Sequence, residues 1–523
     1  MSPRAVSGAG PTPYTYIHWL CATAQHRPDA VALSDPNITV TYGDLVQRMK
    51  TSARLLVAAG LQQGQPVCMA MTASADYAAW IFGCLLAGGV AAPVNTRLSG
   101  VEVAAYVDRL GPTLLVCDAV NSHLFEQAGV ATMIVDEGSL VSDAESSNHE
   151  EVSIVEQLAA LDEDGPSIIF PTGGTTGLPK GAYTDHRGLL TWAWNIAFGS
   201  RRHADETELF FSPFFHVSLM VGVFAALFGG GAIVIEPTFD AGRAIQLIAD
   251  RGITRLQGSP TMYVALMNHP DASVETFALV RDSIFGASAA TGSFVSRILA
   301  EFPNARITTG YGATELASGV SRVEDADLRD GRIEGVGRPN VGCEMRVIDK
   351  DGHDVEPGHV GDLIVRSPWQ TLGYWRQPDE TASTYRSDGF INLGDLARFD
   401  ADGWLHIAGR SKEMIITGGE NVYPIEVEQV LNAQPGVAEV VVFGVPDEQW
   451  GERVEAVVTA GPGTELDVER IRRDVRSSLA GYKVPKRIHV VDQIPLTPNN
   501  KPNRRALTAR YTEHGTHPHD NQL

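Results

Sequence analysis

Cysteine is scarce in this sequence, and its spacing argues against a disulfide framework or a metal site. The chain of 523 residues holds five cysteines, and no two of them form a CxxC pair. Most lie inside apolar runs, such as Leu114-Leu115-Val116-Cys117. A free cysteine in such a run behaves as a small buried apolar residue. We therefore predict buried, reduced thiols at Cys21, Cys68, Cys84, Cys117 and Cys343.

Basic residues are also in the minority. Lysine and arginine number 41 against 63 aspartates and glutamates, so the formal net charge is −22. This acidic balance argues against non-specific nucleic-acid binding, and no nucleic-acid partner is predicted. An acidic protein that binds a small polyanion must concentrate positive potential locally. The few cations near glycine-rich loops are therefore the informative ones.

Two stretches bear on targeting and membrane insertion, and neither has the pattern of a signal peptide or a membrane span. Residues 1–10 contain no apolar signal core, so secretion is not indicated. The run 214–235 is almost wholly apolar and about long enough to span a bilayer. However, His216, Ser218 and the three glycines at 229–231 interrupt it, which favours a buried helix, a turn and a strand at 232–235. We predict a cytoplasmic protein with no integral membrane segment.

The order of apolar runs predicts a large α/β domain over residues 1–411. Strands at 66–71 and 88–95 flank a helix at 76–87, and short loops between them imply parallel pairing. The pattern returns between 181 and 309, so two layered α/β subdomains are expected within about 1–330. From about 331 to 410, short alternating segments separated by Asp-Gly and Pro-Gly turns predict an antiparallel sheet, which we expect to form a small β-barrel.

A second, smaller α+β domain is predicted over residues 412–512. Helices are expected to begin at Pro424 and Val468, with strands within 437–445 and at 487–491. About a hundred residues are enough for an independent domain. The polar, histidine-rich residues 513–523 are predicted to be a disordered tail.

The most informative stretch is a loop rich in glycine and threonine. The apolar residues 167–170 read as a buried strand that leads into Thr172-Gly-Gly-Thr-Thr-Gly-Leu-Pro-Lys180. Glycines let backbone N–H groups turn toward an anion, threonines add hydroxyl donors, and the lysine adds a point charge. A bland surface turn is the alternative. A Walker loop does not fit, because Leu178 and Pro179 separate the last glycine from the lysine.

This loop resembles the phosphate-binding loop of the adenylate-forming enzymes, which include acyl-CoA synthetases, luciferases and peptide-synthetase adenylation domains. Six motifs of that family occur in family order between residues 42 and 505. The resemblance implies ATP binding by the loop residues, with Thr175 and Lys180 also assigned to catalysis. The loop residues concerned are Thr172, Gly173, Gly174, Thr175, Thr176, Gly177 and Lys180.

A second motif, Gly310-Tyr311-Gly312-Ala313-Thr314-Glu315, follows a predicted strand. Its aromatic ring can stack on a base, its hydroxyl can reach a phosphate, and its carboxylate suits magnesium. The alternative is a loop with a capping threonine. The motif resembles the family's GYGxTE sequence, which implies nucleotide contacts at Gly310, Tyr311, Gly312 and Thr314 and a magnesium ligand at Glu315. Upstream, the resemblance places the adenine side at Gly286, Ala287 and Ser288.

Further matches follow toward the C-terminus. The resemblance implies ribose contacts at Asp395 and Arg410, a hinge at Lys412, and a catalytic adenylation lysine at Lys501, which also contacts the nucleotide. Asn392-Leu393 replaces the usual His-Thr before the Gly-Asp pair, and Asn500 replaces a glycine before the lysine. The run Gly418-Gly419-Glu420 resembles the acyl-CoA-synthetase version of its motif, in which glycines let a pantetheine arm pass close to the backbone.

The residues Phe214-Phe215-His216 indicate the class of acid substrate. Amino-acid-activating relatives place an aspartate just after the first phenylalanine, and this chain does not. The resemblance places His216 and Met220 between the acyl pocket and the CoA channel. We expect Leu219, Met220, Val223, Phe224 and the small residues 287–290 to line a roomy apolar pocket for a fatty, aryl or alicyclic acid.

The resemblance thus implies an acid–CoA ligase that uses ATP, Mg²⁺ and coenzyme A and acts through an acyl-adenylate. An enzyme that passes the acyl group to a carrier protein, a luciferase-like oxygenase and a catalytically inactive nucleotide sensor remain alternatives. The implied partners are a small carboxylic acid, ATP and CoA, and a homodimer is left open.

Overall fold

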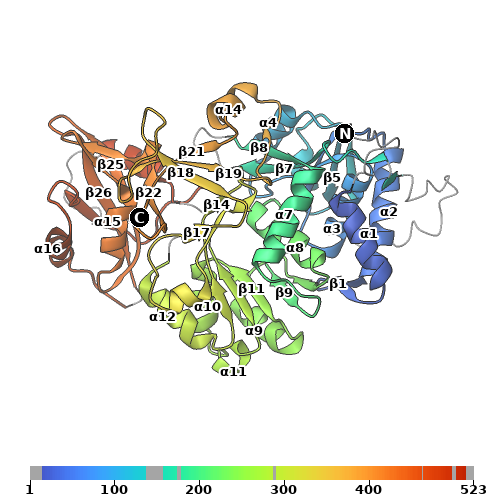
Figure 1. Ribbon diagram of the computed structural model, residues 1–523, viewed down its shortest axis with the longest axis horizontal. Coiled ribbons are helices and arrows are strands. Elements are labelled where there is room, and N and C mark those ends of the chain that lie inside the picture. The colour runs from blue at the N-terminus through green and yellow to red at the C-terminus, as the bar shows by residue number, and fades with distance from the viewer. Residues whose placement is uncertain are drawn as a thin grey trace, which may run out of the picture.

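The computed structural model describes most of the chain (Figure 1). The described residues are 14–136, 140, 157–158, 160–172, 178–211, 213–286, 290–461, 463–497 and 502–513. Two seven-stranded sheets with helices on them form the N-terminal part, an antiparallel sheet follows, and an α+β unit ends the chain. This confirms the predicted class, an α/β fold of two layered subdomains with a separate α+β segment.

The first sheet carries the glycine-rich loop. Its strand order is β20-β8-β7-β4-β3-β5-β6. All pairs among the five strands from β7 to β6 in this order are parallel, whereas β8 pairs antiparallel with both β7 and β20. The glycine-rich loop therefore joins an antiparallel hairpin. The strands are β3 (Pro66–Ala70), β4 (Val90–Pro93), β5 (Leu114–Asp118), β6 (Thr132–Val135), β7 (Pro166–Thr172), β8 (Lys180–Asp185) and β20 (Gly373–Tyr374).

The second sheet has the order β13-β12-β11-β9-β10-β1-β2. All its pairs are parallel except β1 with β2, so two strands from the N-terminus extend a sheet otherwise built from residues after 206. The strands are β1 (Val31–Ser34), β2 (Thr39–Thr41), β9 (Thr207–Phe210), β10 (Ala232–Ile235), β11 (Arg255–Gly258), β12 (Asp282–Phe285) and β13 (Arg306–Thr308).

Helices join the two sheets through one shared core. The largest buried cluster includes Phe170 of the first sheet, Ile233 of the second, and residues of α3, α7 and α8. The predicted helix, turn and strand at 214–235 are confirmed as α8 and β10. The helices are α1 (Tyr16–His26), α2 (Tyr42–Ala58), α3 (Ala75–Leu86), α4 (Gly100–Leu110), α7 (His186–Gly199), α8 (Val217–Phe228), α9 (Ala241–Asp250), α10 (Pro260–Asn268), α11 (Val274–Phe277), α12 (Gly292–Glu301) and α13 (Asp325–Arg329), with the 3-10 turn η1 (Ser122–Phe125).

The antiparallel region is an open four-stranded sheet rather than the expected small barrel. Its order is β18-β19-β21-β22, and among the described residues no pairing joins the edge strands β18 and β22. A barrel requires its first and last strands to pair, so this sheet does not close. The strands are β18 (Glu344–Ile348), β19 (Gly361–Arg366), β21 (Ile391–Phe399) and β22 (Leu405–Arg410), with short ladders β14 (Gly312–Ala313) to β15 (Ser318–Gly319) and β16 (Ser321–Arg322) to β17 (Arg338–Pro339).

The C-terminal unit, orange to red in Figure 1, packs helices on a five-stranded sheet. Helices at 424 and 468 and strands near 437 and 487 appear as predicted, while β26 and α17 were not anticipated. Residues 514–523 of the predicted tail lie outside the described residues. The elements are β23 (Ile415–Thr417), β24 (Glu420–Val422), α15 (Pro424–Asn432), β25 (Val437–Asp447), β26 (Gly451–Ala460), α16 (Val468–Ser478), β27 (Arg487–Val490) and α17 (Arg504–Glu513), after the 3-10 turn η2 (Ser411–Glu413) and the large-domain helix α14 (Pro378–Thr384).

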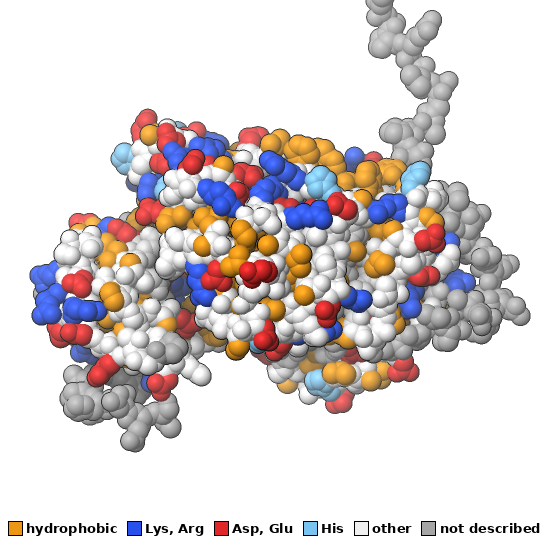
Figure 2. Space-filling model, turned by 90° about the horizontal axis from the view of Figure 1, so that it is seen from below, with side chains coloured by type: hydrophobic (Ala, Val, Ile, Leu, Met, Phe, Trp, Pro, Cys, Tyr) orange, Lys and Arg blue, Asp and Glu red, His pale blue; other side chains and the backbone are white. Residues whose placement is uncertain are grey.

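Four of the five predicted buried thiols are confirmed, whereas Cys343 is only partly buried. All five cysteines are free and four are buried; burial raises the pKa of Cys21 to about 11. Acidic and basic side chains are interspersed over the face drawn in Figure 2. Within the described residues, no helix is both long enough and apolar enough to cross a membrane.

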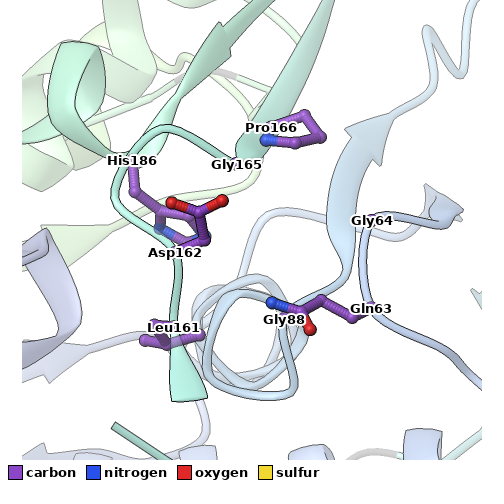
Figure 3. A pocket seen from close by; sticks show the side chains of 8 residues that line it. All are labelled: Gln63, Gly64, Gly88, Leu161, Asp162, Gly165, Pro166 and His186. Carbon is purple, nitrogen blue, oxygen red and sulfur yellow. The ribbon is translucent and has the colours of Figure 1, made fainter. Parts of the chain in front are cut away.

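A cavity of about 330 Å³ opens at the amino end of β7, away from the glycine-rich loop at the strand's other end (Figure 3). His186, the first residue of α7, lines it opposite the backbone of Gly64 and Gly88. Only 2% of His186 is exposed, and burial lowers its pKa to about 4, although the nearby Asp162 opposes the shift. The imidazole is therefore neutral in the folded protein at neutral pH.

This burial predicts a pH-dependent stability that a His186→Phe variant should lack. In the unfolded chain the His186 imidazole binds a proton below about pH 6.5, whereas in the folded protein it binds one only below about pH 4. The unfolded state is therefore favoured as the pH falls between these values, and the stability of the wild type decreases. We expect the wild type to lose roughly 3 kcal/mol more than the variant between pH 7 and pH 4. Urea unfolding at a series of pH values measures it, and parallel curves for the two proteins would contradict the prediction.

Candidate active site

The glycine-rich loop is bracketed by the ends of two strands. In the β7–β8 ladder, Thr172 pairs with Lys180, so the strand ends bring the first and last predicted phosphate contacts opposite each other. Thr172 is buried. At the far end of the loop, the Arg109 side chain donates to the Pro179 carbonyl at 2.9 Å. Two cations, Lys180 and Arg109, thus lie at a loop whose composition suits a polyphosphate.

Lys180 already has an anionic partner from the large domain. Its ammonium forms an ion pair with Glu380 of α14, and it lies 4.6 Å from the centre of the Tyr374 ring. The hydrogen bond from Lys180 lowers the pKa of Glu380, and the charges of Lys412 and Arg109 act in the same direction. Glu380 therefore stands as a carboxylate among three cations.

Glu315 is held at both its backbone and its side chain. Its carboxylate accepts the Tyr374 hydroxyl at 2.8 Å through Oε1, and its carbonyl accepts both the N–H and the hydroxyl of Thr371, at 3.0 and 2.7 Å. Among the described residues, Oε2 has no hydrogen-bond partner. Ala317 closes the following turn with a left-handed φ of 50°. A fixed carboxylate with one oxygen available fits a hard cation such as magnesium.

The ribose-side residues form a second cluster. Asp395 and Arg410 are paired across the β21–β22 ladder, and the Arg410 Nε lies 2.8 Å from Asp395 Oδ1. The Tyr311 hydroxyl donates to Oδ2 of the same carboxylate. Burial, with Asp395 beside it, raises the pKa of Tyr311, so the phenol stays protonated. No local pattern indicates this Tyr311–Asp395 bond, because the predicted stacking role of Tyr311 involves only its ring.

Gly310 has a packing reason to be glycine. A Cβ at this position would lie 2.1 Å from the Ser321 carbonyl oxygen. The close approach brings the Gly310–Glu315 segment against β16, where the Ser321 hydroxyl accepts the Tyr311 N–H at 3.1 Å. Gly312 and Thr314 lie in the same segment, in and just after β14. Gly286 directly follows β12, and its N–H donates to the Gly258 carbonyl.

The predicted acyl pocket is only partly supported. His216 lies at the start of α8, with its ring 4.7 Å from that of Phe215. Val223 and Phe224, however, are buried in the core shared by the two sheets, where Phe224 packs against Tyr16 at 4.6 Å. Their position on the apolar helix gave no means of telling a pocket wall from the core. The same two residues also line a small apolar cavity beside Phe214, so the roomy acyl pocket stays a prediction.

The hinge and channel residues lie at the start of the C-terminal unit. Lys412 is exposed in the turn η2. Gly418 and Gly419 form the two-residue turn between β23 and β24, with φ of 61° and 84°, and Glu420 begins β24. Positive φ at both positions is what a tight hairpin requires, so these glycines have a local structural reason beside the predicted channel role.

Several predicted residues lie outside the described part of the chain. The side chain of Met220 is among them, as are the loop centre, the rest of the adenine-side loop and the adenylation lysine: Gly173, Gly174, Thr175, Thr176, Gly177, Ala287, Ser288 and Lys501.

Comparison with known proteins decides the family. A family model described as AMP-binding enzyme matches residues 20–375, and the model of its C-terminal domain matches residues 426–501. The chain belongs to the AMP-binding enzyme family. The motifs used above to assign the site therefore come from the chain's own family.

Relatives of this AMP-binding enzyme include a feruloyl-CoA synthase of Amycolatopsis, 32% identical over 92% of this chain and 96% of that protein. A fatty acid–[acyl-carrier-protein] ligase of Streptomyces coeruleorubidus is also 32% identical, over 93% of this chain and 95% of its own length. Among solved structures, the o-succinylbenzoate–CoA synthetase of Bacillus subtilis in complex with ATP and magnesium superposes with a TM-score of 0.82, at 25% identity, over 94% of this chain and 98% of the other.

Four residues of the AMP-binding enzyme contact the site without belonging to any of the predicted motifs. Thr371, Tyr374 and Glu380 reach Glu315 or Lys180, and Arg109 reaches the loop from α4. The local sequence around these residues indicates only secondary structure. Gly373-Tyr374 is typical of the end of a strand, and Pro378-Asp-Glu is typical of the start of a helix. Nothing in these patterns indicates which distant residues the side chains contact.

The Lys180–Glu380 pair predicts tighter nucleotide binding in a Glu380→Gln variant. The Glu380 carboxylate competes with a phosphate for the Lys180 ammonium, and the two anions also repel each other. Because the Glu380 side chain is 47% exposed, the pair is weak, and we expect ATP to bind about two- to fivefold more tightly. Calorimetric titration without the acid substrate measures this. The gain should shrink at high salt, and weaker binding would mean that Glu380 instead orients Lys180 for phosphate.

Proposed function

We propose that this AMP-binding enzyme is an ATP-dependent ligase that joins an apolar carboxylic acid to the thiol of coenzyme A and releases pyrophosphate and AMP. The observation that carries the proposal is the convergence of charged groups from distant parts of the chain. Lys180 and Glu315 both contact Tyr374. Asp395 forms an ion pair with Arg410 and a hydrogen bond with Tyr311. Polyphosphate and ribose partners are thus provided by one set of strand ends and loops.

The first half-reaction forms an acyl-adenylate. A carboxylate oxygen of the acid attacks the α-phosphorus of ATP, a new P–O bond forms, and the bond to pyrophosphate breaks with its electron pair leaving on pyrophosphate. Both reactants are anions, so their repulsion and the charge that builds up on the phosphorus oxygens dominate the barrier. Preorganised cations and backbone donors lower such a barrier most effectively.

The site residues have the following proposed roles. Thr172 to Lys180, with Thr175 in a catalytic role, hold the phosphates, and Lys501 bridges the acid and the α-phosphate. Asp395 and Arg410 hold the ribose, and the Gly286–Ser288 loop and Tyr311 hold the adenine side. Glu315 would hold magnesium, which supplies positive charge to the phosphates when bound.

The second half-reaction transfers the acyl group. The thiol sulfur of CoA attacks the acyl carbonyl carbon, the C–O bond to AMP breaks, and the thiol proton is released. We propose that the C-terminal unit turns about Lys412 between the half-reactions. The hairpin at Gly418, Gly419 and Glu420 would then face the pantetheine arm, with His216 between that arm and the acyl group.

The acid is apolar: a fatty, aryl or alicyclic acid. No carboxylate follows Phe214 to pair a substrate amine, and the two residues there, Phe214 and Phe215, are buried aromatics. The relatives named for feruloyl and fatty acyl substrates support the same range. We place the reaction in the cytoplasm, where ATP and CoA are available, and a homodimer remains a prediction that light scattering can test.

A panel of carboxylic acids tests the function. We expect pyrophosphate release with ATP, magnesium and at least one fatty, aryl or alicyclic acid, followed by AMP release that depends on CoA. Release of AMP only with an acyl carrier protein would assign the acceptor to the carrier instead. Nucleotide binding without pyrophosphate release for any acid would identify an inactive nucleotide-binding protein.

A further inference from the structure

Tyr374 contacts both Glu315, the proposed magnesium ligand, and Lys180, the proposed phosphate-binding cation. Its hydroxyl donates to Glu315 Oε1 at 2.8 Å, and Lys180 Nζ lies 4.6 Å from the centre of its ring. The two contacted residues are 135 positions apart in the sequence and belong to different motifs, 311–315 and 172–180. One side chain therefore joins the proposed magnesium ligand to the proposed phosphate cation.

The fold holds Tyr374 in place. The β20–β8 ladder pairs Tyr374 with Ala182, two residues after Lys180, so its backbone is fixed relative to the end of the loop. Its ring packs edge-on against Tyr385 at 5.8 Å, and the Tyr385 hydroxyl lies 2.5 Å from that of Thr371. Thr371 in turn holds the Glu315 carbonyl. Only 6% of Tyr374 is exposed.

We propose that Tyr374 is a positioning residue that fixes the Glu315 carboxylate and the Lys180 ammonium relative to each other. The inference rests on the proposed function, because the two groups are taken to act on magnesium and phosphate. The hydroxyl orients the carboxylate by binding one oxygen, which directs the other toward a cation. The ring attracts the ammonium through its π-face and limits where this flexible side chain can go.

The two contacts can be separated by substitution. Tyr374→Phe removes the hydroxyl and keeps the ring, so only the carboxylate should lose its support. Tyr374→Leu removes both. ATP binding is measured by calorimetry without an acid substrate, once with magnesium and once with EDTA. The ratio of the two dissociation constants gives the magnesium enhancement, which does not depend on turnover.

We expect Tyr374→Phe to reduce the magnesium enhancement about ten- to a hundredfold, the effect of losing a hydrogen bond to a charged group, while ATP binding in EDTA is unchanged. Tyr374→Leu should also weaken ATP binding in EDTA by about two- to fivefold. A loss of general structure would lower binding under both conditions for both variants. That pattern does not match the selective loss expected of Tyr374→Phe.

Tyr42→Phe is the matched control. It removes another buried tyrosine hydroxyl, which donates to the Gly231 carbonyl at 2.8 Å, and should leave both dissociation constants unchanged. An unchanged magnesium enhancement in Tyr374→Phe would overturn the inference, as would the absence of any enhancement in the wild type. The proposed function is judged separately by acid-dependent pyrophosphate release from the wild type, so the two can fail independently.

Discussion

Replacing Lys501 by alanine is expected to slow acyl-adenylate formation by about 10²–10³-fold, the cost of one lost preorganised donor. The proposed role of its ammonium is to bridge the two repelling anions, the acid carboxylate and the α-phosphate. If the C-terminal unit turns away afterwards, the lysine has left before the thiol attacks. Thioester formation from a supplied acyl-adenylate should therefore slow far less. Pyrophosphate release measures the first half-reaction, and acyl-CoA formation from synthetic acyl-adenylate measures the second.

Lys483→Ala is a suitable control for this experiment. Lys483 belongs to the same C-terminal unit, and its ammonium lies 2.6 Å from Glu426, also in that unit. Loss of this lysine should leave both half-reactions near their wild-type rates. Equal losses in the two half-reactions of Lys501→Ala would contradict the role proposed for Lys501, because a group that acts in only one conformation cannot serve both.

Local patterns account for the parts of the fold that could be predicted. The apolar run at 167–170 became β7, and the run at 214–235 became α8 and β10, because each element has a periodicity or turn signal within its own residues. The composition of the glycine–threonine loop suits a polyphosphate, and the family resemblance assigned it to ATP. The residues proposed for the nucleotide site were therefore assigned from short motifs.

Long-range pairing accounts for much of what could not be predicted. The antiparallel direction of β8, and the addition of β1 and β2 to a sheet formed mostly after residue 206, depend on partners far away in sequence. The Tyr374–Glu315 bond joins residues 59 positions apart. Neither residue's neighbours carry a signal for the other. Likewise, an apolar helix such as α8 does not reveal which of its faces meets the core and which meets a ligand.

A buried ion-pair network is another feature that the sequence does not reveal, and it predicts a large loss of stability in Arg255→Met. Arg255 of β11 has no exposed surface, and its guanidinium contacts Glu206 at 3.0 Å and Asp282 at 3.2 Å. It also donates to the Ser200 carbonyl at the end of α7, at 2.8 Å. Methionine fills much of the space but removes the close partner of buried Glu206, which keeps Arg202 at 4.0 Å, whereas Asp282 keeps its ion pair with Arg306. We expect a loss of about 3–5 kcal/mol in unfolding free energy, measured by urea denaturation.

Two further variants separate the effect of unpaired charge from that of altered packing. Arg281 directly precedes β12, the strand beside β11, and forms an exposed ion pair with Asp205. The unfolding midpoint of Arg281→Met should stay at the wild-type value. Glu206→Gln added to Arg255→Met removes the buried charge that has lost its close partner and should recover about 1–2 kcal/mol. Because methionine packs identically in both backgrounds, that recovery can come only from the carboxylate. A double variant no more stable than Arg255→Met would assign the loss to packing and contradict the role of the ion pair.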